Sequence, residues 1–280
     1  MSSVIQVRGL TKKFGQQFTA VNDLSFSVHK GDVYGFLGQN GAGKSTTIRM
    51  LLSLIEPTAG DIEIFGLPLA ANRSAIMQKV GAVIEKPAMY EYLTAYQNLK
   101  IFSALSGVSK TKTQLLQELD VVGLAARAQD NVGTFSQGMK QRLAIAMAMV
   151  NDPELILLDE PTNGLDPQGI ADIRNLILQL SREQGKTVLV SSHLLSEIEQ
   201  VATRLIIIDK GCKLVEGDSK ELFDTSKTVV AIQTLDNKQA TELLLQSSWA
   251  KQVLVNRSTD KEIFMQLDEK YLPNLHKNLV

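Results

Sequence analysis

The chain has 280 residues, enough for one large domain or for one domain with a small addition. Hydrophobic residues make up 44% and charged residues 21%, which is ordinary for a folded protein. The formal net charge of -1 gives no support to a bulk electrostatic grip on nucleic acid or anionic lipid.

A single cysteine, Cys212, excludes an intrachain disulfide and fits a reducing cytosol. The first 14 residues contain no apolar run of signal-peptide length. Apolar stretches such as 143–150 are far too short to cross a bilayer. If the protein acts at a membrane, we expect another chain to cross it.

The first half of the chain changes pattern twice. Residues 5–28 form short alternating stretches with turn residues, as antiparallel strands do. Residues 33–37 then read as a strand, and residues 46–54 read as a helix. Between about residues 91 and 127 the strand signals vanish and the pattern is helical, which predicts an inserted helical lobe.

Continuous apolar runs appear in the second half, at residues 155–158, 187–190 and 205–208. Runs of this kind, separated by helical patterns, indicate strands that are buried on both faces of a mainly parallel sheet. The fold class is therefore α/β. After about residue 225 the elements are shorter and carry no chemical motif, which predicts a small accessory α+β domain.

The segment 38–45 reads Gly-Gln-Asn-Gly-Ala-Gly-Lys-Ser and fits the pattern G-x-x-x-x-G-K-[ST] between a predicted strand and a predicted helix. Glycines let such a loop curl until its N–H groups point at phosphate oxygens, and the helix start adds partial positive charge. Lys44 can then reach the β- and γ-phosphates, and Ser45 can bind Mg²⁺. The alternative is a glycine turn that contains a lysine. The expected phosphate-binding residues are Gly38, Gln39, Asn40, Gly41, Ala42, Gly43, Lys44, Ser45 and Thr46.

Two acids, Asp159 and Glu160, close the apolar run 155–158. The carboxyl end of a buried parallel strand is where α/β sheets bind ligands. Asp159 is placed to hold Mg²⁺, and Glu160 is placed to polarise an attacking water as a general base. The alternative is a solvated acidic pair at a strand end.

Four further segments carry a resemblance to a known family. Residues 157–167, Leu-Leu-Asp-Glu-Pro-Thr-Asn-Gly-Leu-Asp-Pro, resemble the Walker B and D-loop block of ABC ATPases. Residues 134–142 resemble the signature motif of that family, and residues 191–193, Ser-Ser-His, resemble its switch-histidine segment. Phe14 falls where the family places an aromatic that stacks on adenine, although a plain core role is the alternative.

The resemblance implies a P-loop NTPase fold of the ABC ATPase type that binds ATP and Mg²⁺. It implies a nucleotide-binding domain at 1–225, with an antiparallel β subdomain and a helical subdomain at about 86–130, followed by an accessory domain at 226–280. Within the site it implies that His193 contacts the γ-phosphate, beside the catalytic residues Lys44 and Glu160.

The signature segment departs from the family pattern. Ser136 and Gly138 remain, and Ser136 precedes a predicted helix, so its hydroxyl and the free N–H groups form an anion site or only a helix cap. Gln137 and Met139 replace the usual glycine and glutamine. In the family's Q-loop position stands Glu85, which can still contact Mg²⁺ but adds negative charge near the phosphates.

Within the family, the segments 81–87, 93–99 and 136–142 most resemble bacitracin- and lantibiotic-type export ATPases. The resemblance implies a cytoplasmic subunit held at the inner face of the cell membrane by a separate integral membrane permease. One phosphate loop and one signature per chain imply a homodimer, or a pair with another ATPase subunit, around two ATP molecules.

Three rival functions disagree with features of the sequence. A DNA-acting or ribosome-acting ABC ATPase disagrees with the short lobe, the single cassette and the lack of a basic patch, so no nucleic-acid partner is expected. A module that senses ATP without turnover disagrees with Glu160. A GTPase disagrees with the lack of an Asn-Lys-x-Asp segment.

Overall fold

The computed structural model describes residues 3–15, 17–84, 89–223 and 239, together with the backbone of 228–232, 254–258 and 263–267. The chain divides into two compact units, residues 1–219 and residues 220–280. Within the part of the chain that is described, no helix has both the length and the apolar character needed to span a bilayer.

The first unit begins with a four-stranded antiparallel sheet of order β2-β1-β4-β5. β1 (Ser3–Phe14) and β2 (Phe18–His29) form a long hairpin, and β4 (Ala59–Ile64) and β5 (Leu67–Pro68) complete the sheet. Over much of the two long strands, buried apolar residues alternate with partly or fully exposed ones, so one face of the sheet packs on the core. The antiparallel strands expected near the N-terminus are confirmed.

A second sheet of six strands, in the order β10-β9-β3-β8-β7-β6, carries the rest of the first unit. Every neighbouring pair is parallel except β10 and β9. The strands are β3 (Val33–Leu37), β6 (Val80–Val83), β7 (Leu155–Leu158), β8 (Thr187–Ser192), β9 (Arg204–Asp209) and β10 (Cys212–Asp218). The apolar runs of the sequence are therefore strands of one mainly parallel sheet, as expected.

Four helices connect the strands of the two sheets: α1 (Lys44–Leu51), α2 (Leu69–Met77), α6 (Pro167–Arg182) and α7 (Leu195–Val201). α1 begins two residues earlier and ends three residues earlier than the helix expected at 46–54. Its start is fixed by Gly43, whose φ of 105° ends the preceding loop, and Ser53 with a φ of 51° prevents its extension.

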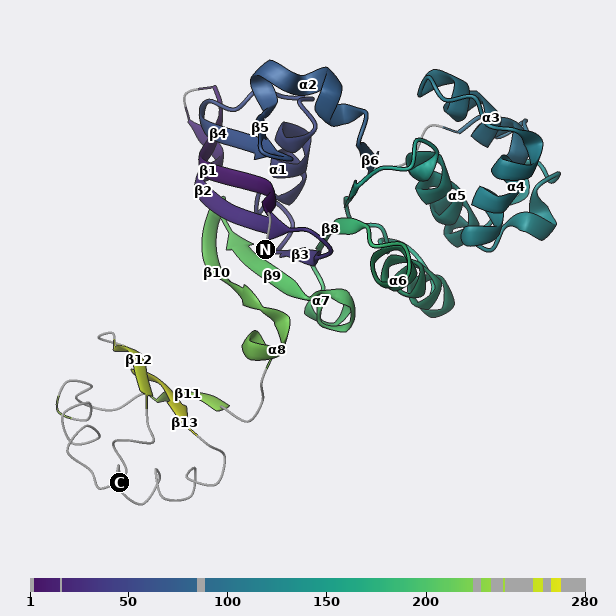
Figure 1. The fold of residues 1–280 in the computed structure, drawn as a ribbon. Helices are drawn as coiled ribbons and strands as arrows, with labels where there is room; N and C mark the ends of the chain where they lie inside the picture. Colours follow the sequence, from purple (N-terminus) through teal and green to yellow (C-terminus); the bar gives the residue numbers. More distant parts are fainter. Residues whose placement is uncertain are drawn as a thin grey trace. The chain divides into compact units, whose positions relative to one another are not determined.

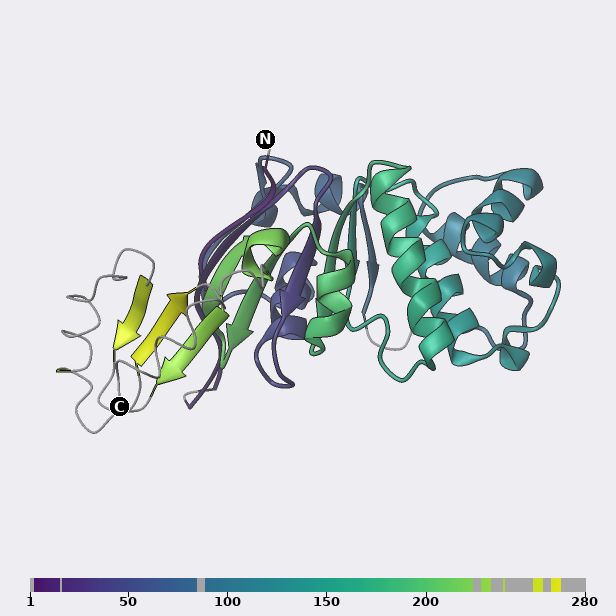
Figure 2. The same cartoon turned by 90° about the horizontal axis from the view of Figure 1, so that it is seen from below.

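The lobe consists of α3 (Ala95–Leu105) and α4 (Lys112–Val121), which pack with α5 (Gln137–Met149). Thr94 and Thr111 each form a capping box with a glutamine three residues later, which satisfies N–H groups at both helix starts. Figure 1 and Figure 2 both show these helices gathered beside the strands of the first unit.

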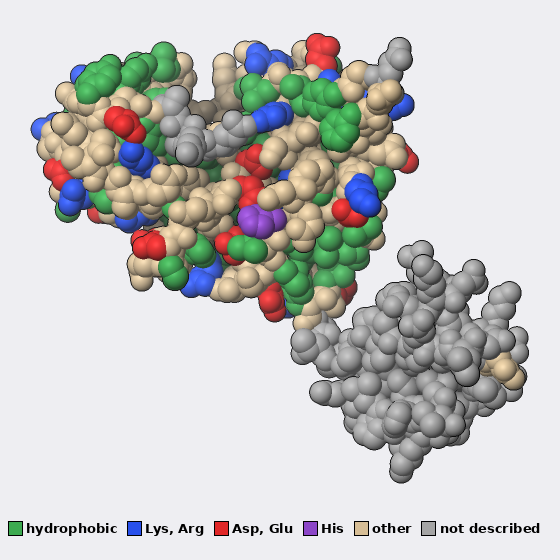
Figure 3. Space-filling view, turned by 180° about the vertical axis from the view of Figure 1, so that it is seen from behind, with side chains coloured by type: hydrophobic (Ala, Val, Ile, Leu, Met, Phe, Trp, Pro, Cys, Tyr) green, Lys and Arg blue, Asp and Glu red, His purple; other side chains and the backbone are tan. Residues whose placement is uncertain are grey.

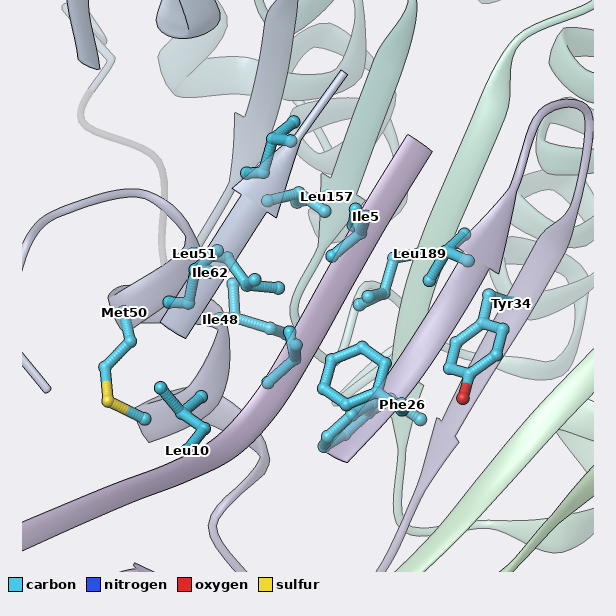
Figure 4. Close-up of a cluster of buried hydrophobic side chains, with 14 of the residues drawn as sticks. Ile5, Leu10, Phe26, Tyr34, Ile48, Met50, Leu51, Ile62, Leu157 and Leu189 are labelled. Carbon is cyan, nitrogen blue, oxygen red and sulfur yellow. The ribbon is translucent and has the colours of Figure 1, made fainter. Parts of the chain in front are cut away.

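The core of the first unit joins both sheets through α1. Ile48, Met50 and Leu51 of this helix are fully buried. Figure 4 shows them in one cluster with Ile5 and Leu10 of the antiparallel sheet and Leu157 of the parallel sheet. The glycine-rich loop of residues 38–45 runs into the first turn of α1. Packing of α1 in this core therefore fixes where the loop lies.

The second unit contains a three-stranded antiparallel sheet of order β11-β13-β12. Its strands are β11 (Thr228–Ile232), β12 (Leu254–Ser258) and β13 (Ile263–Leu267), and the short helix α8 (Ser219–Leu222) lies at the boundary between the units. The strands of the small C-terminal domain are thus present. The helices expected there fall outside the described residues.

Replacing Ile48 by alanine is expected to lower the midpoint of urea unfolding, because a large-to-small change in a fully buried site costs about 2–5 kcal/mol. Circular dichroism of the full chain measures the change. Leu214→Ala is the matched control, since Leu214 is an exposed apolar residue, and its midpoint should stay near wild type. Equal midpoints for the two variants would contradict the role given to α1.

Candidate functional site

The loop of residues 38–45 runs from the end of β3 to the start of α1 and is held tightly against neighbouring backbone. The Ala42 oxygen accepts a hydrogen bond from the Gly211 N–H at 3.0 Å. A Cβ on Gly43 would lie 2.6 Å from the Ala20 oxygen, and one on Gly38 would lie 2.5 Å from the Ile208 oxygen. Only glycine fits at such approaches.

The start of α1 offers free backbone donors on the inner side of this loop. No side chain caps the helix at Gly43. The first N–H groups of any helix have no partner within the helix, and they carry partial positive charge. Gln39, Asn40 and Gly41 are exposed on the loop, whereas Ala42 is buried against the sheet. A loop with these free donors suits an anion such as phosphate.

Lys44 lies across this cradle with only 4% of its surface exposed. Its Nζ donates to the Gly38 oxygen at 2.6 Å and to the Gln39 oxygen at 3.2 Å. The same ammonium is 3.1 Å from Oε1 of Glu160. A buried cation is thus placed at the centre of the loop and is neutralised by a carboxylate from a different strand.

Asp159 and Glu160 follow β7, all of whose residues are buried. The Ser191 hydroxyl donates to Asp159 Oδ1 at 2.6 Å and accepts from the Glu160 N–H at 2.9 Å. Glu160 has a φ of 48°, a left-handed conformation that is strained for a residue with a side chain. One buried serine thus holds the Asp159 carboxylate and the Glu160 backbone, and Asp159 is only 6% exposed, so the pair is not a solvated one.

His193 follows β8, the strand between β3 and β7, and its Nδ1 lies 2.8 Å from Glu160 Oε2. Glu160 Oε1 is buried and makes no hydrogen bond of acceptable geometry, although Lys44 is close. Such an incompletely satisfied buried oxygen is typical of a functional centre. The structure therefore brings together Lys44, Asp159, Glu160 and His193, as the sequence predicted.

The donors at this site fit Mg²⁺ and a nucleotide phosphate. Ser45 stands in the first turn of α1, and the nearly buried Asp159 stands at the end of β7. Hydroxyl and carboxylate oxygens are the ligands that Mg²⁺ prefers. Glu85, the third metal ligand expected from the sequence, lies outside the described residues.

Ser136 and Gly138 lie at the start of α5, which packs against the lobe helices α3 and α4. Ser136 is the N-cap of this helix, and its hydroxyl accepts from the Met139 N–H at 3.3 Å. Across the described residues, no hydrogen bond or ion pair joins either residue to the phosphate loop. Figure 1 shows α5 with the lobe helices rather than with α1. The signature is therefore not part of the Lys44–Glu160 centre within one chain.

Phe14 ends β1 and is 46% exposed, so the core alternative for this residue is wrong. Phe18, which begins β2, is 58% exposed, and the two rings stack with centroids 6.4 Å apart. Lys12 Nζ lies 5.2 Å from the Phe14 ring centre. An exposed aromatic pair of this kind offers a flat surface for stacking. The sequence analysis missed Phe18.

Comparisons with known proteins agree with this geometry. The family described as ABC transporter matches residues 21–163. The bacitracin transport ATP-binding protein BcrA of Bacillus licheniformis is 46% identical over 246 residues, which are 88% of this chain and 80% of that protein. The lantibiotic transport ATP-binding protein SrtF of Streptococcus pyogenes is 39% identical over 77% of this chain and 91% of that protein.

Among solved structures, the dimeric post-hydrolysis state of the ATP-binding cassette MJ0796, bound to ADP and Pi, superposes with a TM-score of 0.68 at 26% identity. The match covers 77% of this chain and 98% of that one. Two findings assign the chain to this family: its identity to the relatives named above and the match to the family over residues 21–163. The matched segment contains the phosphate loop, Ser136 and the acids after β7. The chain belongs to the ABC transporter ATP-binding proteins and is an ATPase that uses ATP with Mg²⁺.

Proposed function

We propose that this chain is the motor subunit of a transporter that exports a bacitracin-like or lantibiotic-like antimicrobial compound. The observation that carries the proposal is the 46% identity to a bacitracin transport protein over 80% of that protein's length, and the contacts of Glu160 with Lys44 and His193 support it. A separate integral membrane permease provides the path for the compound. The subunit therefore works on the cytoplasmic side, at the inner face of the membrane.

The roles of the site residues follow from their positions. The Lys44 ammonium attracts the β- and γ-phosphates into the loop. Phosphate oxygens can replace its present partners, which are Glu160 and the carbonyl groups of the loop. Ser45 and Asp159 would hold Mg²⁺, which neutralises phosphate charge when it is bound. The loop N–H groups and Thr46 orient the phosphates.

Glu160 is the proposed general base. Its carboxylate takes a proton from the attacking water, and His193 holds that carboxylate through the 2.8 Å contact while it faces the γ-phosphate. Lys44 stabilises the negative charge that builds on the transferred phosphoryl group. Glu85 is proposed as a further contact to Mg²⁺ on the strength of its sequence position alone.

Two copies complete the site. Ser136 is exposed at the start of a 13-residue helix, where a hydroxyl and backbone N–H groups can bind an anion. We place this residue and Gly138 against the γ-phosphate held by the other copy. The dimeric state of the related cassette supports this arrangement. A paired ATPase subunit of another sequence would serve equally.

The domain division proposed is a nucleotide-binding domain at 1–225 and an accessory domain at 226–280. The compact units at 1–219 and 220–280 support it. No nucleic-acid partner is proposed. On the face seen in Figure 3, the described Lys and Arg side chains are scattered among acidic ones rather than gathered in a patch.

Lys44→Ala should reduce ATP hydrolysis by about 10²–10³-fold and weaken nucleotide binding, because it removes the charge that faces the phosphates. Phosphate release and titration with a fluorescent ATP analogue measure the two effects. The control is Lys79→Ala, since Lys79 forms an exposed ion pair with Glu154. Normal turnover by a folded Lys44→Ala protein would show that the phosphate loop is wrongly assigned.

Glu160→Gln should bind ATP but hydrolyse it about 10²–10⁴-fold more slowly, because the shape remains and the base is lost. With Mg²⁺ and ATP the variant should accumulate as a dimer, which light scattering detects, while wild type is mostly monomer. Adding Ser136→Arg should return it to monomer, since a bulky cation blocks the closed interface. A double variant that still dimerises with ATP would refute the composite site, and Glu160→Gln with wild-type turnover would refute the base.

Phe14→Ala should weaken binding of ATP and GTP by the same factor, since stacking is worth about 1–3 kcal/mol per base and does not read base edges. Competition titrations of both nucleotides measure it, with Leu67→Ala as a control at an exposed site of the same sheet. A loss for ATP alone would indicate a hydrogen-bonding base pocket instead.

A further inference from the structure

One carboxylate outside the centre described above accepts two hydrogen bonds on a single oxygen. Oε2 of Glu197 lies 2.7 Å from the Thr162 hydroxyl and 2.7 Å from the Ser192 hydroxyl. Thr162 is 8% exposed and Ser192 is 1% exposed, so both donors are buried. Glu197 itself lies in the first turn of α7.

The two hydroxyls flank the catalytic contact in sequence. Thr162 follows Glu160 by two residues, on the turn after β7. Ser192 immediately precedes His193, at the end of β8. The contact between Glu160 Oε2 and His193 Nδ1, at 2.8 Å, therefore joins two loops that Glu197 also joins a few residues away.

The hydrogen bonds of Ser192 fix the direction in which its hydroxyl proton points. The Ser192 hydroxyl accepts from the Leu194 N–H at 3.0 Å, so its own proton points to Glu197. Among the described residues, Glu197 forms no ion pair with lysine or arginine, and the nearby Arg174 donates to Gln200 instead. The Glu197 carboxylate therefore accepts hydrogen bonds from the two hydroxyl groups. Hydrogen bonds to a charged acceptor are stronger than those between neutral groups.

We infer that Glu197 is a positioning residue that clamps the loop after β7 to the end of β8 and so holds Glu160 and His193 at their contact distance. The inference rests on the roles proposed above for those two residues. Glu160 needs such support, because its left-handed backbone persists only where the surrounding structure holds it. Losing the clamp frees the turn that carries the base.

Three variants of the full chain test the clamp: Glu197→Ala, Glu197→Gln, and the pair Thr162→Val with Ser192→Ala. The first and third remove both hydrogen bonds, and glutamine keeps an oxygen that accepts them. Glu199→Ala is the matched control, since Glu199 is exposed on the same helix.

The expected result is a fall in kcat for ATP of about 10²-fold in Glu197→Ala, the size of loss that a small misplacement of a reacting group produces. KM should change by less than about threefold, because the phosphate loop is untouched. Glu197→Gln should recover most of kcat. Glu197→Ala should add nothing on the Thr162→Val, Ser192→Ala background, since the same two bonds are already lost.

A crystal structure of Glu197→Ala gives a readout that does not depend on turnover. We expect Glu160 Oε2 and His193 Nδ1 to be separated beyond their 2.8 Å contact. An unchanged contact, wild-type kcat, or a loss that the background double variant does not absorb would each overturn the inference. Glu197→Ala could instead lower the midpoint of unfolding and change kcat and KM to the same extent. That result would show a purely structural role for Glu197 and would also overturn the inference.

The proposed catalytic roles fail separately. If Glu160→Gln turns over like wild type, the base is wrongly assigned whatever Glu197 does. If Glu160→Gln is slow and Glu197→Ala is normal, only the clamp is wrong.

Discussion

The carboxylate of Glu160 is the contact that links the residues of the proposed catalytic centre. One of its oxygens lies 3.1 Å from the Lys44 ammonium and the other 2.8 Å from the His193 ring. These three residues follow β7, β3 and β8, which are neighbours in one sheet. Because the strands are parallel, their carboxyl ends meet at the same edge, and Lys44 and His193, distant in sequence, both reach the Glu160 carboxylate. A different strand order would leave each of them alone.

The phosphate loop is held in place by contacts with the protein interior. Gly211 donates to the Ala42 oxygen, Gly43 lies against the backbone of β2, and α1 is anchored between the two sheets by fully buried side chains. None of these contacts uses the N–H groups that face the phosphates. These contacts with both sheets hold the loop in place, and a loop held in this way needs little reorganisation to bind an anion.

The sequence predicted the elements whose pattern is local. The apolar runs after residue 30 are strands, the glycine-rich segment is a loop before a helix, and Ser136 caps a helix. It missed β4, β5, β6 and β10, which are short or carry mixed polar residues. The bounds of α1 differed because left-handed residues at its ends, not its apolar spacing, decide them. Ser191 and Glu197 could not be found, because their partners are set by which strands lie side by side.

The left-handed backbone of Glu160 has a consequence for how this position can change. A side chain held at a φ of 48° costs about 1–3 kcal/mol that the rest of the fold must offset. Glycine would relieve that strain but would lack a carboxylate. If Glu160 is the base proposed above, stability and activity favour different residues at this position.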